Sequence, residues 1–357
     1  KPKYEYSYNY QNWYPSVEYE TKNTRQNVGL FDLTPFAKFE LKGELAHSEL
    51  QRICTANVKK EIGKTTYTQM LNKDGGIEAD LTIACLNKEL FRVISSAAVR
   101  IRDKHHILKH LNPRVEFKDV SDDYACLGLF GPKSRSLITD LAGDYFKTKD
   151  FPFGTGKNII IKGVKIWAQR LSYVGELGWE LYIPMKEVYN IYKLIVEHGK
   201  KYSLCHAGVH AMDTLRMEKG YLHWGHDISP EENQYEAGLT FTISHKKNIN
   251  FIGREALINL KNKKNKKKLV ILSLKNNKPG FPLLLHDEPI LCKGKIIGHT
   301  TSGNYSFNYN KNIAFGYINI KADFSEDEIE IEVEKKLYKA EILKKPLHDP
   351  ENKFLFS

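Results

Sequence analysis

Apolar and polar residues alternate most regularly in the stretch IEADLTIACL, residues 77–86, which predicts a β-strand with one apolar face. The preceding YTQML is a second strand candidate, and Asp74 with two glycines between them favours a tight turn. Glu78 and Asp80 are two residues apart, so both should point to the same side of the ribbon. Two acids on an otherwise apolar strand raise the question of what that side contacts.

Elsewhere strand patterns alternate with segments of helical period. Residues 29–43 read as a strand pair closed by a glycine, and residues 90–98 as a further strand. Leu45, Leu50 and Ile53 have helical spacing, and an amphipathic helix follows up to the Asn-Pro at 112–113. The same style recurs as strand, turn and helix over 124–143, and as a hairpin over 164–184 followed by a helix. This order predicts an α+β fold of antiparallel sheets with helices on one side.

A dense lysine block, KNKKNKKK at 261–268, separates this region from a different pattern. It follows a predicted helix and precedes a strand, so we interpret it as a solvated linker. From about residue 269 to residue 342, short strands recur with turns such as CKGK and TSGNYS. This part therefore predicts a separate small β-barrel or sandwich.

Composition excludes several classes of protein. The 357 residues, 41% hydrophobic and 27% charged, suit an ordinary globular protein, and no apolar run reaches the ~18 residues of a membrane helix. The first twenty residues lack the apolar centre of a secretory signal. The five cysteines are scattered and never form C-x-x-C, which predicts reduced thiols and a cytoplasmic location.

The net charge of +11 does not by itself indicate nucleic acid, because the lysine block inflates it and no known RNA or DNA module is present. We therefore expect no nucleic-acid partner. G-x-G-x-x-G after a strand and the P-loop motif are both missing, which argues against nicotinamide and nucleoside-triphosphate chemistry. A nucleophile elbow is also missing, so nucleophilic catalysis has little support.

Two groups of acids are candidates for chemistry. Asp80 is either solvated on an exposed face or held in a cleft to bind or move a proton. In YVGELGWEL, Tyr173, Glu176 and Glu180 lie around two glycines, which allow the backbone to approach a flat ligand. A buried glutamate there suits the N–H edge of a heterocycle, but an ordinary strand with exposed acids remains an equal alternative.

The segment MDTLRMEKGYLHWGHDI, residues 212–228, predicts a short helix that ends at Gly220. Its Arg216 is left for an anion or a carboxylate. Histidines at 206, 210, 223 and 226 have the chemistry of metal ligands, but Gly208 weakens helical presentation of the first pair and no acid or cysteine completes a recognisable ligand set. The sequence therefore predicts no metal site.

Together these stretches resemble the folate-binding aminomethyltransferase superfamily, which includes the glycine cleavage T-protein and the carboxy-terminal folate half of dimethylglycine and sarcosine dehydrogenases. The resemblance covers nearly the whole chain. It rests on motifs in family order: GLFDLTPFAKFELKG, YTQMLNKDGGIEADLTI, GLFGPKS, YVGELGWELYIP, MDTLRMEKGYLHWGHDISPEENQYEAGL, FIGREAL and GHTTSGNYSFNYNKNIAFGYI. The early NWY and the closing PLHDPENK are nearer to the dehydrogenase branch.

The resemblance implies T-protein-like folate-binding domains over residues 1–260, in two subdomains, and a C-terminal β-barrel over 269–350. It implies that Asp80 is the catalytic carboxylate beside the reactive edge of tetrahydrofolate. Glu180 would bind the pterin edge. The other implied cofactor-binding residues are Tyr67, Tyr173 and Arg216. The chain departs from the T-protein pattern at Ala79, where an aspartate is usual, and at Ser96, where an asparagine is common.

The implied activity is transfer of an aminomethyl or N-methyl-derived carbon from a small-molecule amine to tetrahydrofolate. A lipoyl carrier protein or a flavoprotein oxidase or dehydrogenase would supply the donor, and direct methyl transfer from an onium donor is a third option. Two alternatives remain open: the folate half of a split or truncated dehydrogenase, and a folate-binding module without catalysis.

Overall fold

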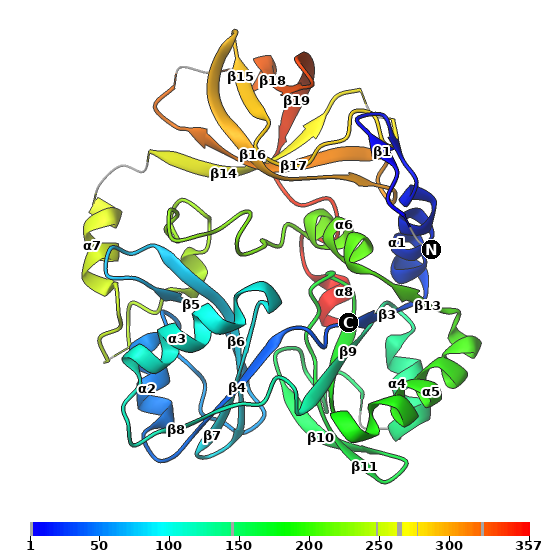
Figure 1. The fold of residues 1–357 in the computed structure, drawn as a ribbon, viewed down its shortest axis with the longest axis vertical. Helices are drawn as coiled ribbons and strands as arrows, with labels where there is room; N and C mark the ends of the chain where they lie inside the picture. The colour runs from blue at the N-terminus through cyan, green and yellow to red at the C-terminus, as the bar shows by residue number, and fades with distance from the viewer. Residues whose placement is uncertain (1–2, 144–145, 248, 263–265, 277, 323–324) are drawn as a thin grey trace.

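The computed structural model describes residues 3–143, 146–247, 249–262, 266–276, 278–322 and 325–357. Two sheets lie side by side in the lower half of Figure 1, and a closed barrel lies above them. The α+β class and the C-terminal barrel are therefore confirmed. The central part of the lysine block, residues 263–265, lies outside the described residues.

A six-stranded sheet has the order β10-β11-β12-β9-β3-β13, and all its pairings are antiparallel except that of β13 with β3. Helices α4 and α5 pack on one face and bury an apolar core that includes Trp179 and Leu181. Its elements are β3 (Val28–Asp32), β9 (Tyr124–Phe130), β10 (Gly156–Ile161), β11 (Val164–Gln169), β12 (Gly178–Pro184), β13 (Leu204–Ala207), α4 (Ser134–Ala142) and α5 (Val188–Gly199).

A five-stranded antiparallel sheet has the order β5-β6-β7-β4-β8. Ala79, Leu81 and Ile83 of β6 face its core, which helices α2 and α3 help to close. The predicted hairpin of β5 and β6 is present. The elements of this part are β4 (Ala37–Lys42), β5 (Thr65–Leu71), β6 (Ile77–Asn87), β7 (Leu90–Ser95), β8 (Glu116–Asp119), α2 (Ala46–Ile53) and α3 (Arg100–His110).

The strand pair predicted over residues 29–43 is wrong in one respect. Both strands form, but β3 pairs with β9 and β13, whereas β4 pairs with β7 and β8. The link between them contains Pro35, which has no N–H to donate to a ladder. This link carries the chain from one sheet to the other.

The two sheets meet through the faces that their helices leave uncovered. A buried cluster in this layer joins Ala84 of β6 to Trp167 and Tyr182 of β11 and β12. Helix α6 (Val209–Lys219) contributes Ala211 and Leu215 to the same cluster. The layer between the sheets is therefore lined by side chains from both halves of the fold.

The barrel closes in the order β14-β17-β16-β15-β18-β19 around an apolar core. Beyond it the chain returns to the sheets, where Asp349 pairs with Lys219 and the carbonyl of Ser357 accepts from Arg135. The remaining elements are β1 (Tyr6–Ser7), β2 (Tyr10–Gln11), α1 (Tyr14–Gln26), α7 (Arg254–Asn262), β14 (Lys267–Leu274), β15 (Pro289–Cys292), β16 (Lys295–Ser306), β17 (Lys311–Asn319), β18 (Ile329–Val333), β19 (Lys336–Leu343) and α8 (Lys353–Phe356).

All five cysteines are free thiols, as the sequence predicted, and all five are buried. Within the part of the chain that the structure describes, no helix has both the length and the apolar character needed to cross a bilayer.

Candidate functional site

Asp80 lies on β6 directly opposite Gln69 of β5, and the two side chains are hydrogen-bonded. Gln69 donates from Nε2 to Oδ1 of Asp80 at 2.7 Å. Asp80 as a whole residue is half-buried, and protein surrounds it closely. Burial raises the pKa of Asp80 to about 6, and hydrogen bonds from Gln69 and Tyr67 oppose that rise.

A buried amide and hydroxyl network fixes Gln69. Its Oε1 accepts hydrogen bonds from Gln234 at 2.7 Å and from the Thr242 hydroxyl at 2.5 Å. With its oxygen engaged in this way, the amide must turn its N–H₂ toward Asp80. Gln234 also donates to Thr55, which follows α2. Through Gln234 the segment after α6 is therefore joined both to the hairpin and to the end of α2. The orientation of the Asp80 carboxyl is thus set by four polar residues behind it.

Two of the predicted aromatic residues lie beside Asp80. Tyr67 is 38% exposed as a residue, and its ring stacks on Phe241 with 6.2 Å between ring centroids. Burial of its hydroxyl and the neighbouring Asp80 charge hold the pKa of Tyr67 well above its usual value. Tyr173 donates to the carbonyl of Leu222 at 2.7 Å, and its pKa is raised by burial and more weakly by Asp80. The structure therefore brings Asp80, Tyr67 and Tyr173 together.

Glu180 lies on the other sheet, in β12. Its Oε2 accepts a hydrogen bond of 2.7 Å from the hydroxyl of Tyr182, and its cross-strand neighbour is Gln169. Glu180 is half-buried, and burial raises its pKa while the Tyr182 hydroxyl opposes the shift. It is therefore a carboxyl in a restricted environment rather than an acid on an exposed strand.

Strand alternation shows that the two acids face the same layer. The side chain of Asp80 points to the same side of β6 as that of Ala84, and the side chain of Glu180 points to the same side of β12 as that of Tyr182. Ala84 and Tyr182 belong to one buried cluster between the sheets. Asp80 and Glu180 consequently project toward this shared layer from opposite sheets.

Arg216 is only 1% exposed and is fully engaged by protein oxygens. Its guanidinium binds Asp213, Asp227, the carbonyl of Tyr221 and the Ser302 hydroxyl of the barrel. A guanidinium has five N–H groups, and these contacts use them. The carboxylate partners expected for Arg216 are therefore its own chain's, and its direct contact with a cofactor stays a prediction.

The remaining candidates have structural partners. Glu78 pairs with Arg102 of α3, and Glu176 pairs with Arg25 and His348. His223 and His226 stack on each other, with 4.6 Å between ring centroids. Among the described residues, no three His, Cys, Asp or Glu side chains are grouped so that they could hold a metal ion.

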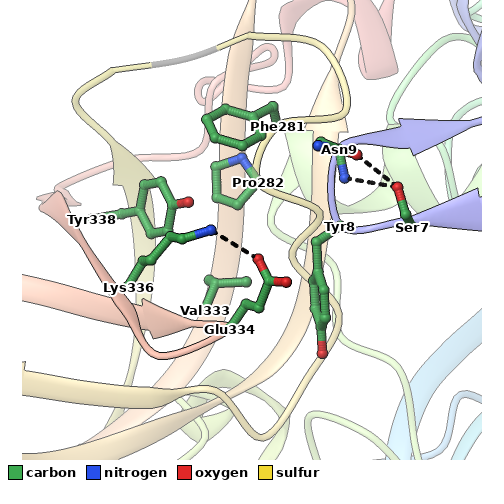
Figure 2. A pocket seen from close by; sticks show the side chains of 9 residues that line it. All are labelled: Ser7, Tyr8, Asn9, Phe281, Pro282, Val333, Glu334, Lys336 and Tyr338. Atoms are coloured by element: carbon green, nitrogen blue, oxygen red, sulfur yellow. Dashed lines mark hydrogen bonds and ion pairs between the residues drawn. The ribbon is translucent and has the colours of Figure 1, made fainter.

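Two hollows at the surface lie away from the acids. One of about 150 Å³ lies between the β1–β2 segment and the barrel, where Tyr8, Phe281 and Tyr338 surround a Lys336–Glu334 ion pair (Figure 2). The other, of about 630 Å³, is an open groove between α1 and β13. Neither is lined by Asp80 or Glu180, so neither bears on their chemistry.

Sequence reasoning missed Gln69, Gln234, Gln169 and Tyr182. Gln69 follows Tyr67 by two residues, and Tyr182 follows Glu180 by two, so strand alternation placed both on the faces of predicted site residues. Gln234 lies in the motif SPEENQYEAGL, but no local pattern indicates that its partner is 165 residues away.

Two family models match the chain. The GCVT N-terminal domain matches residues 2–247, and the glycine cleavage T-protein C-terminal barrel domain matches residues 267–349. The aminomethyltransferase T of the glycine cleavage system from Bartonella henselae has a similar fold, with a TM-score of 0.85 and 22% identity over 98% of this chain and 94% of that one.

Curated relatives fall into two groups by length. The 4-methylaminobutanoate oxidase (formaldehyde-forming) of Paenarthrobacter nicotinovorans is 35% identical over 99% of this chain but only 43% of its own length. The mitochondrial dimethylglycine dehydrogenase of Rattus norvegicus is 33% identical over 96% of this chain and 40% of its own. The aminomethyltransferase of Halothermothrix orenii is 34% identical over 93% of this chain and 92% of its own. The chain belongs to the glycine cleavage T-protein family of aminomethyltransferases.

Proposed function

We propose that this chain transfers a one-carbon unit from an amine-derived donor to tetrahydrofolate, with Asp80 as the catalytic carboxylate. The observation that carries the proposal is the placement of Asp80 and Glu180 on facing sides of one layer between two sheets. A flat heterocycle held in that layer would have one acid at its reactive edge and another at its recognition edge.

The residues present fit a reduced pterin. A carboxylate such as that of Glu180 can accept two parallel N–H bonds, and Tyr67 and Tyr173 place aromatic rings near Asp80. The net charge of +11 favours a ligand whose tail is anionic, as the glutamate tail of folate is. Bound tetrahydrofolate would supply the nucleophilic nitrogen that accepts the carbon.

Asp80 would orient the donor and stabilise the positive charge that develops on it. A carboxyl with a pKa of about 6 is mainly ionised at pH 7 and above. Because this pKa is close to neutral pH, the carboxyl can also exchange a proton. Gln69 would hold this carboxylate in one rotamer. Glu180 would mainly bind, so its loss should affect affinity more than rate.

Two proposals for tetrahydrofolate-dependent one-carbon transfer differ in the molecule that donates the one-carbon unit. A lipoyl carrier protein would deliver an aminomethyl group, as the full-length match to an aminomethyltransferase favours. A flavoprotein subunit or domain would deliver an iminium, as the partial-length matches to an oxidase and a dehydrogenase favour, because none of the site residues described above can oxidise an amine. The cytoplasmic location predicted from the sequence stays a prediction.

The test compares two variants for binding and for turnover. Glu180→Gln should weaken tetrahydrofolate binding about 10- to 100-fold, the range for a lost charge-assisted hydrogen bond. Asp80→Asn should bind within a few-fold of wild type but lose about 10²- to 10⁴-fold in rate. Binding is measured by calorimetric titration, and turnover with an aminomethyl-lipoyl carrier or with a flavoprotein and its amine.

The outcomes separate the alternatives. Tetrahydrofolate binding without turnover from either donor would identify a binding module without catalysis. Equal turnover in Asp80→Asn and wild type would remove Asp80 from the catalytic role, and failure to bind tetrahydrofolate would overturn the proposal as a whole.

A further inference from the structure

Gln169 carries a buried hydrogen-bond donor that the protein leaves unused. The residue is 0% exposed, and its Nε2 has no hydrogen-bond partner among the residues that the structure describes. Its Oε1 accepts from the indole N–H of Trp167 at 3.4 Å, which leaves the N–H₂ on the other side of the amide. Leaving a buried amide donor unsatisfied is energetically unfavourable, so we looked for the partner that this group would bind.

The residue that carries the unused donor is the cross-strand neighbour of Glu180. Gln169 of β11 and Glu180 of β12 are directly paired across antiparallel strands, and paired side chains on one face stand ~5 Å apart at Cβ. Trp167 and Tyr182 form the next pair along that face, and both belong to the cluster between the sheets. The Gln169 and Glu180 side chains therefore face the same layer as Asp80.

We propose that Gln169 and Glu180 together read one edge of the bound ring, with Glu180 accepting two adjacent N–H groups and Gln169 donating to the carbonyl oxygen beside them. This inference rests on the proposed function and names the ring class that the site selects. The complementary edge belongs to a 2-amino-4-oxopyrimidine, in which an amino group, a ring N–H and a carbonyl stand in a row. The pterin of tetrahydrofolate has this edge, and so does guanine.

The pairing makes Gln169 a specificity residue, because a site that hydrogen-bonds a group discriminates against analogues that lack it. A 4-amino-4-deoxy analogue of tetrahydrofolate places a donor where the natural ring has its oxygen. Two donors then face each other, so Gln169 can contribute nothing to binding of the analogue. The contribution of Gln169 should consequently depend on the substituent at position 4.

The experiment measures the affinities of tetrahydrofolate and its 4-amino-4-deoxy analogue for wild type, Gln169→Met and Gln169→Glu. Methionine matches the length and volume of glutamine without its donor. We expect Gln169→Met to weaken tetrahydrofolate about 10-fold and to change the analogue less than twofold. Gln169→Glu should weaken tetrahydrofolate at least as much, because it replaces the donor by an acceptor.

Gln11→Met is the matched control, because Gln11 is also a buried glutamine, 4% exposed, but contacts Gly280 far from the acids. It should leave both affinities unchanged. Equal losses for both ligands in Gln169→Met would mean a structural role, and unchanged affinities would mean no role; either result overturns the inference. If guanosine binds wild type more tightly than tetrahydrofolate does, the pterin assignment is overturned. Absence of tetrahydrofolate binding in wild type would instead refute the proposed function.

Discussion

Replacing Asp80 by asparagine should stabilise the folded protein at neutral pH while it impairs the site. The carboxyl has a folded-state pKa of about 6 because of burial, against 3.8 for an ordinary aspartate. Between these two values the native state holds a proton that the unfolded state has released. The free energy of unfolding therefore falls as pH rises from about 4 through 6.

The size of the effect follows from the same shift. One pKa unit corresponds to about 1.4 kcal/mol, so the shift of roughly two units costs ~3 kcal/mol at pH 8. Asparagine has no charge to bury, and its Oδ1 can still accept the Gln69 hydrogen bond. Asp80→Asn should thus have nearly wild-type stability at pH 4 and be ~3 kcal/mol more stable at pH 8.

Thermal unfolding of both proteins from pH 4 to pH 8 is the appropriate assay. An unfolding entropy of ~2.1 cal/mol/K per residue predicts a difference in Tm of about 4 °C at pH 8 if the whole chain unfolds together. Asp103 also has a pKa raised to about 6 by burial, so only the difference between variant and wild type is diagnostic. A Tm difference that is constant with pH would refute the reasoning, because an unshifted Asp80 predicts no pH-dependent gap.

Two further predictions concern the residues that hold Asp80 and the barrel in place. Gln69→Leu removes a donor that favours the ionised form, so the acid limb of the rate profile should move to higher pH, whereas Gln51→Leu, at a buried glutamine bonded to Asn57, should leave the limb in place. Asp227→Asn breaks a fully buried pair with Arg216 and should lower the free energy of unfolding by about 3–5 kcal/mol, measured by urea denaturation.

Each of these has a clear contrary outcome. If Gln69→Leu lowers the rate equally at all pH values, Gln69 supports the fold and does not tune the carboxyl. For Asp227 the matched control is Asp122→Asn, which breaks an exposed pair with Arg100 and should cost below ~1 kcal/mol. Equal losses for the two variants would mean that burial adds nothing to the Asp227 pair.

The sequence predicted the hairpin and the position of Asp80 on its second strand, but it could not predict which residue lies opposite Asp80. Counting outward from the turn, where Leu71 pairs with Ile77, would place Thr68 opposite Asp80. A β-bulge between Met70 and Leu71 shifts the register by one residue and brings Gln69 there instead. No composition signal marks this bulge.

Long-range contacts explain the other differences. The sequence predicts that Arg216 binds an anion or a carboxylate, but its partner Asp227 and the Ser302 hydroxyl of the barrel come near it only in the folded chain. Glu176 and Glu180 are four residues apart in one motif, yet Glu176 pairs with Arg25, whereas Glu180 faces the layer between the sheets. The local sequence pattern identifies residues whose side chains could bind a ligand or transfer a proton. The sheet topology determines which of these side chains face the same layer between the sheets.

The hydroxyl contacts between the barrel and the segment after α6 affect how truncation experiments should be interpreted. Thr301 and Ser302 of β16 both donate to Asp227, and Ser302 also accepts from Arg216. A fragment that ends at the lysine-rich segment would lack the barrel, so Arg216 and Asp227 would lose these hydroxyl partners. If such a fragment were inactive, the loss of these structural contacts would explain it. The result would give no evidence that the barrel contacts the substrate.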